Sequence, residues 1–211
     1  MTATALAMSP KFLFLQQFIR HPRMVGSVIP TSEIAIQALL NPVDWREVRC
    51  VVEYGPGTGV FTRRILDRLG PDARLIAIDT NPMFVRHLRQ NIVDERLICV
   101  EGSAADVEDI LAREGFEAAD YIISGLPFST LPPEVADEIA AATARAIRPG
   151  GKFLVYQYSR FVLSRLERFF GHVDQDIVWR CIPPARLFWA CKDQEQGATV
   201  ELSGAESLAA V

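Results

Sequence analysis

The 211-residue sequence predicts an α/β fold built on a mostly parallel β-sheet with helices on both faces. Two observations predict this class. From Cys50 onward, short apolar runs alternate with segments of helical periodicity, which is the pattern of repeated βα units. The first apolar run leads into a turn with glycine at three alternate positions, Gly55, Gly57 and Gly59, before a helical pattern begins. This order of strand, glycine turn and helix places backbone N–H groups around a small molecule.

The composition is that of a folded chain with an uneven distribution of charge. Apolar residues make up 49% of the sequence, so the chain can bury a sizeable core. The net charge of −4 argues against a protein that binds nucleic acid through phosphate contacts. Residues 1–32 nevertheless carry Lys11, Arg20 and Arg23 and no carboxylate. A basic segment on an acidic chain indicates contact with an anionic surface.

Cysteine and histidine usage indicates chemistry without a metal. The four cysteines form no C-x-x-C pair and lie in apolar runs, which predicts reduced core residues in a cytoplasmic protein. The three histidines show no metal-ligand spacing, and no Ser-His-Asp set is evident. No apolar run reaches the length of a bilayer crossing and no signal peptide is recognisable, which predicts a soluble or peripheral protein.

The first part of the chain, residues 1–45, is expected to form a helical extension. Residues 10–21 begin with proline and gather Phe14, Phe18 and other apolar side chains on one side of a helix, with Arg20 opposite. This pattern fits a helix lying in a membrane interface, and it also fits a helix packed on the domain's own core. The absence of carboxylates and the basic residues that follow favour the membrane.

A loop and a short helix complete the extension. Residues 24–32 contain glycine and proline and have no clear strand partner, so they are interpreted either as a lid over a pocket or as a connector between helices. Thr31 or Ser32 then caps a helix that runs to Leu40 and stops before Pro42.

The main domain is expected over residues 46–192, followed by a flexible tail at 193–211. Near-continuous apolar strands indicate a parallel sheet that is buried on both faces. Strands are expected at 50–54, 74–79, 96–100, 119–124, 152–158, 173–182 and 187–191, and helices at 58–69, 82–91, 104–113, 134–147 and 160–170.

Acidic residues at two strand ends suit a small-molecule cofactor. Glu53 ends the first strand, and Asp79 ends the second about 20 residues beyond the glycine turn, where a carboxylate accepts hydrogen bonds from a ribose diol. A dinucleotide-binding turn would need glycine at the position of Val60. The acid followed by G-x-G-x-G instead resembles the first motif of class I S-adenosylmethionine-dependent methyltransferases.

This resemblance implies S-adenosylmethionine as the methyl donor and S-adenosylhomocysteine as the product. Glu53 would lie near the amino group of the cofactor and Asp79 at its ribose. Ser103 stands where the family has an aspartate, so the adenine amino group is met either by Ser103 or by Asp106. The residues assigned to the cofactor are Ser27, Glu53, Gly55, Gly57, Thr58, Gly59, Asp79, Thr80, Ser103, Ala104 and Ser124.

The fourth strand ends in a proline-containing loop that corresponds to the loop facing the transferred methyl group in amine and nucleobase methyltransferases. The carbonyls of Ser124 to Leu126 are expected to accept hydrogen bonds from the target amine. Gly125 stands where an amide side chain is common, which removes an acceptor that an adenine amine would use. Phe128 is expected to form an aromatic wall for an alkylammonium group.

Nearly the whole chain resembles the bacterial phospholipid N-methyltransferases. The resemblance implies a Rossmann-like fold with a seven-stranded sheet that ends in an antiparallel hairpin. It also implies stepwise methylation of phosphatidylethanolamine towards phosphatidylcholine. It rests on residues 12–32, with the run Arg-His-Pro-x-x-Val-Gly-Ser-Val-x-Pro-Thr-Ser, on residues 53–59, and on residues 124–132, 148–159 and 183–189.

Lipid contacts are expected from the N-terminal extension and from the end of the fifth strand with the connection that follows it. Tyr156 and Tyr158 lie on one face of the fifth strand, and they are interpreted either as ligands of the lipid phosphate or methylated head group, or as ordinary strand tyrosines. We expect a monomer bound peripherally to the inner face of the bacterial cytoplasmic membrane, with phospholipid head groups and the anionic membrane surface as partners and no nucleic acid. The residues assigned to membrane contact are Phe14, Phe18, Arg20, Arg23 and Arg160.

Three other functions compete with this interpretation. The same chemistry on another amino-lipid, such as an ornithine lipid, is compatible with every motif. An rRNA adenine dimethyltransferase is disfavoured by the negative net charge, by Gly125 and by the lack of room for a C-terminal RNA-binding domain. A non-catalytic membrane-binding module is disfavoured by the intact glycine turn and Asp79.

Overall fold

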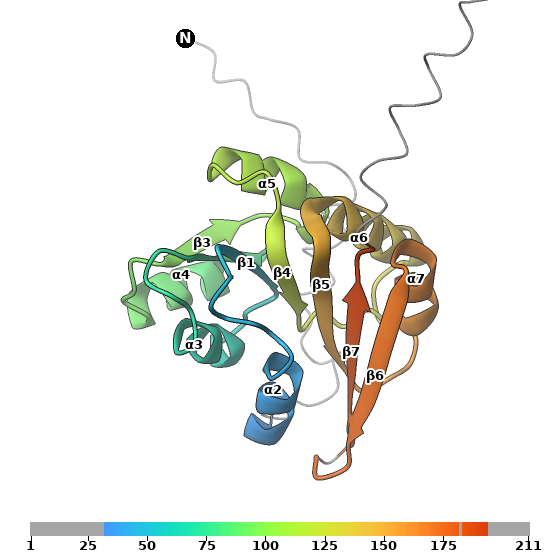
Figure 1. Ribbon diagram of the computed structural model, residues 1–211. Helices are drawn as coiled ribbons and strands as arrows, with labels where there is room; N and C mark the ends of the chain where they lie inside the picture. Colours follow the sequence, from blue (N-terminus) through green and yellow to red (C-terminus); the bar gives the residue numbers. More distant parts are fainter. Residues whose placement is uncertain (1–31, 182, 194–211) are drawn as a thin grey trace, which may run out of the picture.

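The computed structural model describes residues 32–181 and 183–193. In this part of the chain a seven-stranded sheet carries helices on both faces (Figure 1). The strands are β1 (Cys50–Tyr54), β2 (Arg74–Asp79), β3 (Leu97–Glu101), β4 (Ala119–Ser124), β5 (Ile147–Gln157), β6 (His172–Val178) and β7 (Ala185–Cys191). The helices are α2 (Glu33–Leu40), α3 (Val60–Leu66), α4 (Pro82–Asn91), α5 (Val107–Arg113), α6 (Pro133–Ala146) and α7 (Leu163–Phe169), with a 3-10 turn, η1 (Ala104–Asp106).

The strand order is β3-β2-β1-β4-β5-β7-β6. The first five strands of this order run parallel, and β7 lies antiparallel between β5 and β6. This arrangement confirms the predicted Rossmann-like sheet and its antiparallel C-terminal hairpin. The chain winds outward in one direction from β1 to β3 and in the other from β4 to β6, so the ends of β1 and β4 form the switch point where ligands bind in such sheets.

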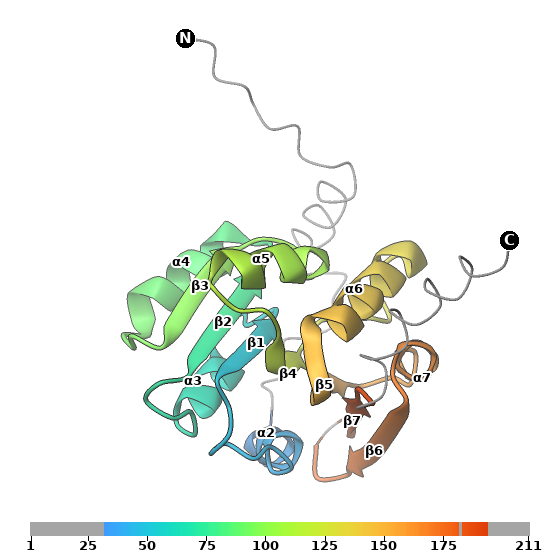
Figure 2. The same cartoon turned by 45° about the horizontal axis from the view of Figure 1, so that its top comes forward.

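The sheet separates two apolar cores. Figure 2 shows α5 and α6 on one side of the sheet and α2 and α3 on the other. Alternate residues of each central strand enter opposite cores; on β1, for example, Val52 packs towards α5, α6 and α7, while Val51 packs towards α2 and α3. Burial on both sides explains why the parallel strands are apolar throughout.

Helix α2 is fixed to the sheet by a buried hydrogen bond. The Trp189 indole Nε1 on β7 donates to the Leu39 carbonyl at 2.9 Å, and the apolar face of α2 is fully buried. The predicted helix ending at Leu40 is therefore confirmed. Ser32 occupies its N-cap position, although its side chain makes no capping hydrogen bond.

The expected element boundaries were wrong mainly near β5 and the final hairpin. Strand β5 already begins at Ile147, which pairs with Ala119, because the ladder continues across a register shift that the Pro-Gly-Gly run conceals in the sequence. Strand β6 ends at Val178 rather than at residue 182, because the chain turns there and the Cys181 N–H donates to the Val178 carbonyl at 3.3 Å.

The division into an extension, a main domain and a tail stays a prediction for the outer parts of the chain. The expected helix at 10–21, most of the loop at 24–32 and nearly all of the tail lie outside the described residues. In the ranges that are described, no helix is long and apolar enough to cross a membrane.

Candidate active site

The glycine turn after β1 forms the floor of the site. Gly55, Gly57 and Gly59 have φ angles of 65°, 54° and 82°, a region that other residues rarely adopt. A Cβ atom on Gly55 would lie 2.9 Å from the Leu126 side chain, whereas a Cβ atom on Gly57 would meet nothing within 4 Å. The turn is thus packed against the β4 loop at one position and open to a ligand at another.

Glu53 is a buried carboxyl group beneath this turn. It is 2% exposed, and the Thr62 hydroxyl of α3 donates to its Oε2 at 2.7 Å. Burial raises the pKa of Glu53 to about 8, against the lowering effect of the Thr62 hydrogen bond and with a contribution from the nearby Asp79 charge. A cationic ligand placed here would favour the ionised carboxylate.

Asp79 joins the end of β2 to the glycine turn. Its carboxylate accepts the Asn81 N–H at 2.8 Å and also the Gly57 N–H, and burial raises its pKa above the ordinary value. The next hydroxyl, Thr80 Oγ1, is buried and has no hydrogen-bond partner among the described residues. A carboxylate with free lone pairs beside an unpaired hydroxyl and the open side of Gly57 fits the ribose diol of S-adenosylmethionine.

The end of β3 carries the two residues considered for the adenine ring. Ser103 is buried and its hydroxyl accepts the Ala105 N–H at 3.2 Å, which caps η1. Asp106 is exposed at the end of this turn. The Ser103 hydroxyl is therefore shielded from solvent, whereas the Asp106 carboxylate is in contact with it.

The loop after β4 is held by several hydrogen bonds, and they change two predicted roles. The Leu126 carbonyl accepts both the Phe128 N–H and the Gln157 side-chain amide, so it is already occupied and is not an acceptor for the target amine. Phe128 is 2% exposed and packs edge-on against Phe153, with ring centroids 6.3 Å apart. The predicted aromatic wall at Phe128 is therefore corrected to a core anchor of the loop.

Gly125 follows the end of β4 and lies next to the glycine turn, which follows the end of the neighbouring strand β1. Its N–H donates to the Tyr54 carbonyl at 3.2 Å, and a Cβ atom added to it would have only the Gly55 carbonyl oxygen nearby, at 3.8 Å. Ser124 Oγ accepts the Leu126 N–H at 3.1 Å. Within the described residues the Gly125 carbonyl accepts no hydrogen bond, so it is available as an acceptor at the start of the loop.

Gln157 was not recognised in the sequence. It is 5% exposed on β5, and its amide holds the Leu126 carbonyl from a position 31 residues away in the chain. Only the pairing of β4 with β5 brings these groups together. A polar residue directly after the apolar run 153–156 was the available signal in the sequence.

Changing Gln157 to methionine is expected to lower turnover about tenfold while leaving cofactor affinity unchanged. Methionine keeps the approximate volume but removes the amide donor, so the Leu126 carbonyl loses a partner and the loop loses part of its fixed geometry. Turnover and calorimetric cofactor binding would be measured together. A variant that turns over as fast as the unmodified protein would show that Gln157 does not position the loop.

Tyr156 lies on β5, whereas Tyr158 directly follows the end of that strand at Gln157, and the two side chains contact each other. Tyr156 OH donates to Tyr158 OH at 2.9 Å, and the Tyr156 ring packs edge-on against Phe61 in the α2–α3 core. Burial raises the pKa of Tyr156 well above its ordinary range. Tyr158 is 41% exposed. The Tyr156 ring therefore packs in the core, whereas the Tyr158 side chain is accessible to solvent or to a substrate.

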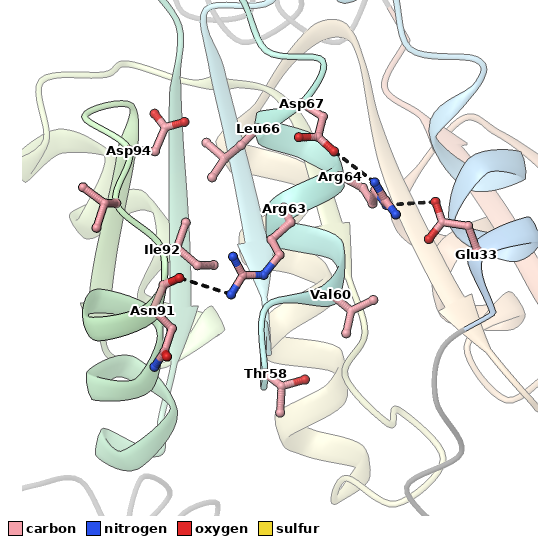
Figure 3. A pocket seen from close by; sticks show the side chains of 11 residues that line it. Glu33, Thr58, Val60, Arg63, Arg64, Leu66, Asp67, Asn91, Ile92 and Asp94 are labelled. Carbon is pink, nitrogen blue, oxygen red and sulfur yellow. Dashed lines mark hydrogen bonds and ion pairs between the residues drawn. The ribbon is translucent and has the colours of Figure 1, made fainter.

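A separate groove of about 510 Å³ runs along the outside of α3 (Figure 3). Its arginines are already engaged: Arg64 pairs with Glu33 at 2.8 Å and Asp67 at 3.2 Å, and Arg63 donates to the Asn91 carbonyl at 3.2 Å. The Thr58 side chain lies at this groove and is exposed. The predicted role of Thr58 at the cofactor stays a prediction.

Several predicted site residues lie outside the described residues, namely Ser27, Phe14, Phe18, Arg20 and Arg23. Arg160 is described and exposed in the connection between β5 and α7. In the described part of the chain, no group of three or more His, Cys, Asp or Glu side chains is arranged to hold a metal ion.

Comparison with known proteins agrees with this geometry. Residues 51–151 match a methyltransferase domain family. The 1,6-didemethyltoxoflavin N1-methyltransferase of Burkholderia thailandensis, solved with S-adenosylhomocysteine, superimposes with a TM-score of 0.64 at 16% identity, over 91% of this chain and 93% of that one. The N-methyltransferase NodS of Bradyrhizobium japonicum gives a TM-score of 0.59 at 14% identity, over 86% of this chain and 98% of that one. The chain has the fold of class I methyltransferases, and S-adenosylmethionine is its cofactor.

A relative with higher sequence identity indicates which methyltransferase family the chain belongs to. The ornithine lipid N-methyltransferase of Singulisphaera acidiphila is 33% identical over 184 residues, which cover 84% of this chain and 94% of the relative. The chain belongs to the S-adenosylmethionine-dependent N-methyltransferase family that contains this enzyme. A ribosomal RNA small subunit methyltransferase A from a Burkholderia species is 30% identical over 62% of this chain, which spans about half (54%) of that relative.

Proposed function

We propose that the protein methylates the amino group of a membrane amino-lipid, with ornithine lipid as the first candidate and phosphatidylethanolamine as the second. The match over nearly the full length of an ornithine lipid N-methyltransferase carries this proposal. It favours the alternative substrate considered from the sequence over phosphatidylethanolamine, on which the resemblance had centred. The partial coverage of the rRNA methyltransferase relative and the missing amide at Gly125 place RNA third.

The β4 loop is proposed to orient the lipid amine. Because Leu126 O is occupied, the Gly125 carbonyl is the backbone group that would accept a hydrogen bond from the amine. The space beside Gly125 and the open side of Gly57 lie at the ends of the neighbouring parallel strands β4 and β1. A substrate amine and the cofactor would meet between them. S-adenosylmethionine supplies the electrophilic methyl group.

The substrate nitrogen needs a free lone pair before it can accept a methyl group. An alkylammonium has an ordinary pKa of about 10.4, so most of it is protonated in neutral water. Removal of the amine from bulk water in a closed site would disfavour the charged form and release the proton to solvent. The proposed contribution of the chain is desolvation and alignment of the neutral amine rather than proton transfer to a dedicated base.

Methyl transfer from radiolabelled S-adenosylmethionine tests the proposal. Vesicles would contain ornithine lipid, phosphatidylethanolamine, or the mono- and dimethyl derivatives of the latter, and ribosomal RNA would be assayed in parallel. Label in ornithine lipid supports the first candidate, and label in phosphatidylethanolamine supports the second. Label confined to RNA would overturn the proposal.

Changing Gly125 to alanine is expected to reduce lipid methylation about 100-fold, because a methyl group would occupy the position proposed for the amine and displace it from alignment. The backbone there tolerates alanine, since Gly125 has no positive φ and the added carbon would meet its nearest atom at an ordinary contact distance of 3.8 Å. Cofactor affinity should be unchanged. Full activity of this variant would place the amine elsewhere.

A further inference from the structure

The carboxyl end of the sheet, at which the site lies, also carries exposed aromatic side chains. Tyr158, Phe161 and Trp179 are 41%, 68% and 72% exposed. Tyr158 and Phe161 lie in the connection that leaves β5, and Trp179 lies in the turn that follows β6. Large aromatic side chains in such numbers at one edge are uncommon on a surface that meets only water.

Strand pairing brings these aromatic residues to the same edge. Gln157 on β5 pairs with Arg186 on β7, and Arg186 pairs with Ile177 on β6. Tyr158 and Trp179 follow just beyond these paired positions. Figure 1 shows the turn between β6 and β7 projecting beyond the end of β5. The turn therefore forms a rim next to the strand end that supplies Tyr158.

The same edge is positively charged in an acidic chain. Arg160 and Arg180 lie in these two connections and Arg186 lies near the start of β7, and the segments 139–166 and 177–192 contain no aspartate or glutamate. None of the three arginines forms an ion pair within the described residues. The chain as a whole has a net charge of −4, so this edge differs in sign from the rest.

Aromatic and cationic side chains together suit one kind of surface. Aromatic rings settle at the boundary between acyl chains and head groups, and arginines are attracted to anionic lipids. We propose that this edge, defined by Tyr158, Phe161, Trp179 and the three arginines, is a bilayer contact surface that holds the active site against an anionic membrane. The proposal rests on the proposed function, because it explains how a lipid amine reaches the β4 loop without leaving the bilayer.

Sedimentation of the full chain with vesicles tests the surface directly. The variants Phe161→Ser and Trp179→Ser, alone and combined, would be compared with Val93→Ser, whose side chain is 98% exposed in the connection between α4 and β3. The combined variant is expected to bind vesicles containing phosphatidylglycerol roughly tenfold more weakly, while Val93→Ser binds as the unmodified protein does. Equal binding by the combined variant and the control would overturn the proposal.

A charge variant gives an independent measurement if the aromatic changes disturb folding. Arg160→Gln with Arg180→Gln should weaken binding about fivefold for each arginine on anionic vesicles and leave binding to neutral vesicles unchanged. Equal losses on both kinds of vesicle would contradict the assignment to anionic lipid.

Catalysis separates the failure of this proposal from failure of the proposed function. If the edge variants lose vesicle binding and no amino-lipid is methylated by the unmodified protein, the contact surface stands and the substrate assignment fails. If amino-lipids are methylated and the edge variants bind and methylate vesicles normally, the substrate assignment stands and the contact surface fails. The variants should also keep their activity on a short-chain, monomeric amino-lipid, which needs no bilayer contact.

Discussion

Replacing Asp79 by alanine is expected to weaken S-adenosylmethionine binding by about 100-fold. Hydrogen bonds to a charged acceptor contribute about 1.5–3 kcal/mol each, and each 1.4 kcal/mol corresponds to about tenfold in affinity. A carboxylate that accepts from both ribose hydroxyls thus accounts for at least this loss. Isothermal titration calorimetry at one pH, with the unmodified protein in parallel, measures it.

The control for Asp79 must separate ligand contact from support of the glycine turn. The carboxylate also accepts the N–H groups of Asn81 and Gly57, so its loss is expected to lower the unfolding temperature as well. Asp79→Asn keeps one acceptor oxygen and should fall between alanine and the unmodified protein in both measurements. Asp109→Ala, an exposed change on α5, should alter neither. Unmodified cofactor affinity in Asp79→Ala would refute its role at the ribose.

The fold and the cofactor half of the site could be predicted because both depend on local patterns. Parallel strands buried on two faces must be apolar along their length, and the chemistry of the glycine turn is contained in consecutive residues. Glu53 and Asp79 were identifiable because each ends a strand whose neighbours were already assigned. Their burial in the structure agrees with those positions.

The substrate half was harder to predict because it depends on contacts between distant residues. Phe128 follows a proline in a loop, a pattern shared by exposed and buried aromatic residues, and only the packing against Phe153 shows that the ring enters the core. Gln157 and Thr62 act on Leu126 and Glu53 through tertiary contacts that no spacing rule describes.

The same reasoning explains the errors at β5 and β6. Residues Pro149 to Gly151 look like a break in the sequence, yet the sheet continues around them with a shift in register. Strand β6 carries few buried residues, so its end is decided by the turn that follows rather than by an apolar pattern. Edge elements are specified weakly by sequence because one of their sides meets solvent.

Cofactor affinity is expected to rise steeply with pH below 8 because of Glu53. The pKa of this carboxyl group is raised to about 8, chiefly by burial, so the free protein at pH 6 holds it mostly protonated. A ligand that carries an ammonium and a sulfonium group binds the ionised carboxylate better than the neutral acid. Binding near pH 6 should therefore release a proton, and affinity should increase up to about tenfold per pH unit until pH approaches 8.

The stability of the free protein should change with pH in the opposite direction. A carboxyl group whose pKa is higher in the folded state binds more protons when folded than when unfolded between its two pKa values. The contribution of Glu53 to stability is therefore greatest below its ordinary pKa of 4.5, and it is lost as the pH rises towards about 8. Bound cofactor should reverse this trend, because it favours the ionised form.

Glu53→Gln is the matched variant for this prediction, since glutamine keeps the shape of the side chain and can still bond to the Thr62 hydroxyl but does not titrate. Its cofactor affinity should be weak and nearly independent of pH between 6 and 7.5, and calorimetry in buffers of different ionisation enthalpy should detect no proton release. The α-amino group of the ligand has an ordinary pKa of about 7.7–8.0 and loses its own proton as the pH approaches 8, so the affinity of the unmodified protein should level off there. If both proteins show the same pH dependence below 8, the proton belongs to another group, and Glu53 contributes to the site only through its packing and its bond to Thr62.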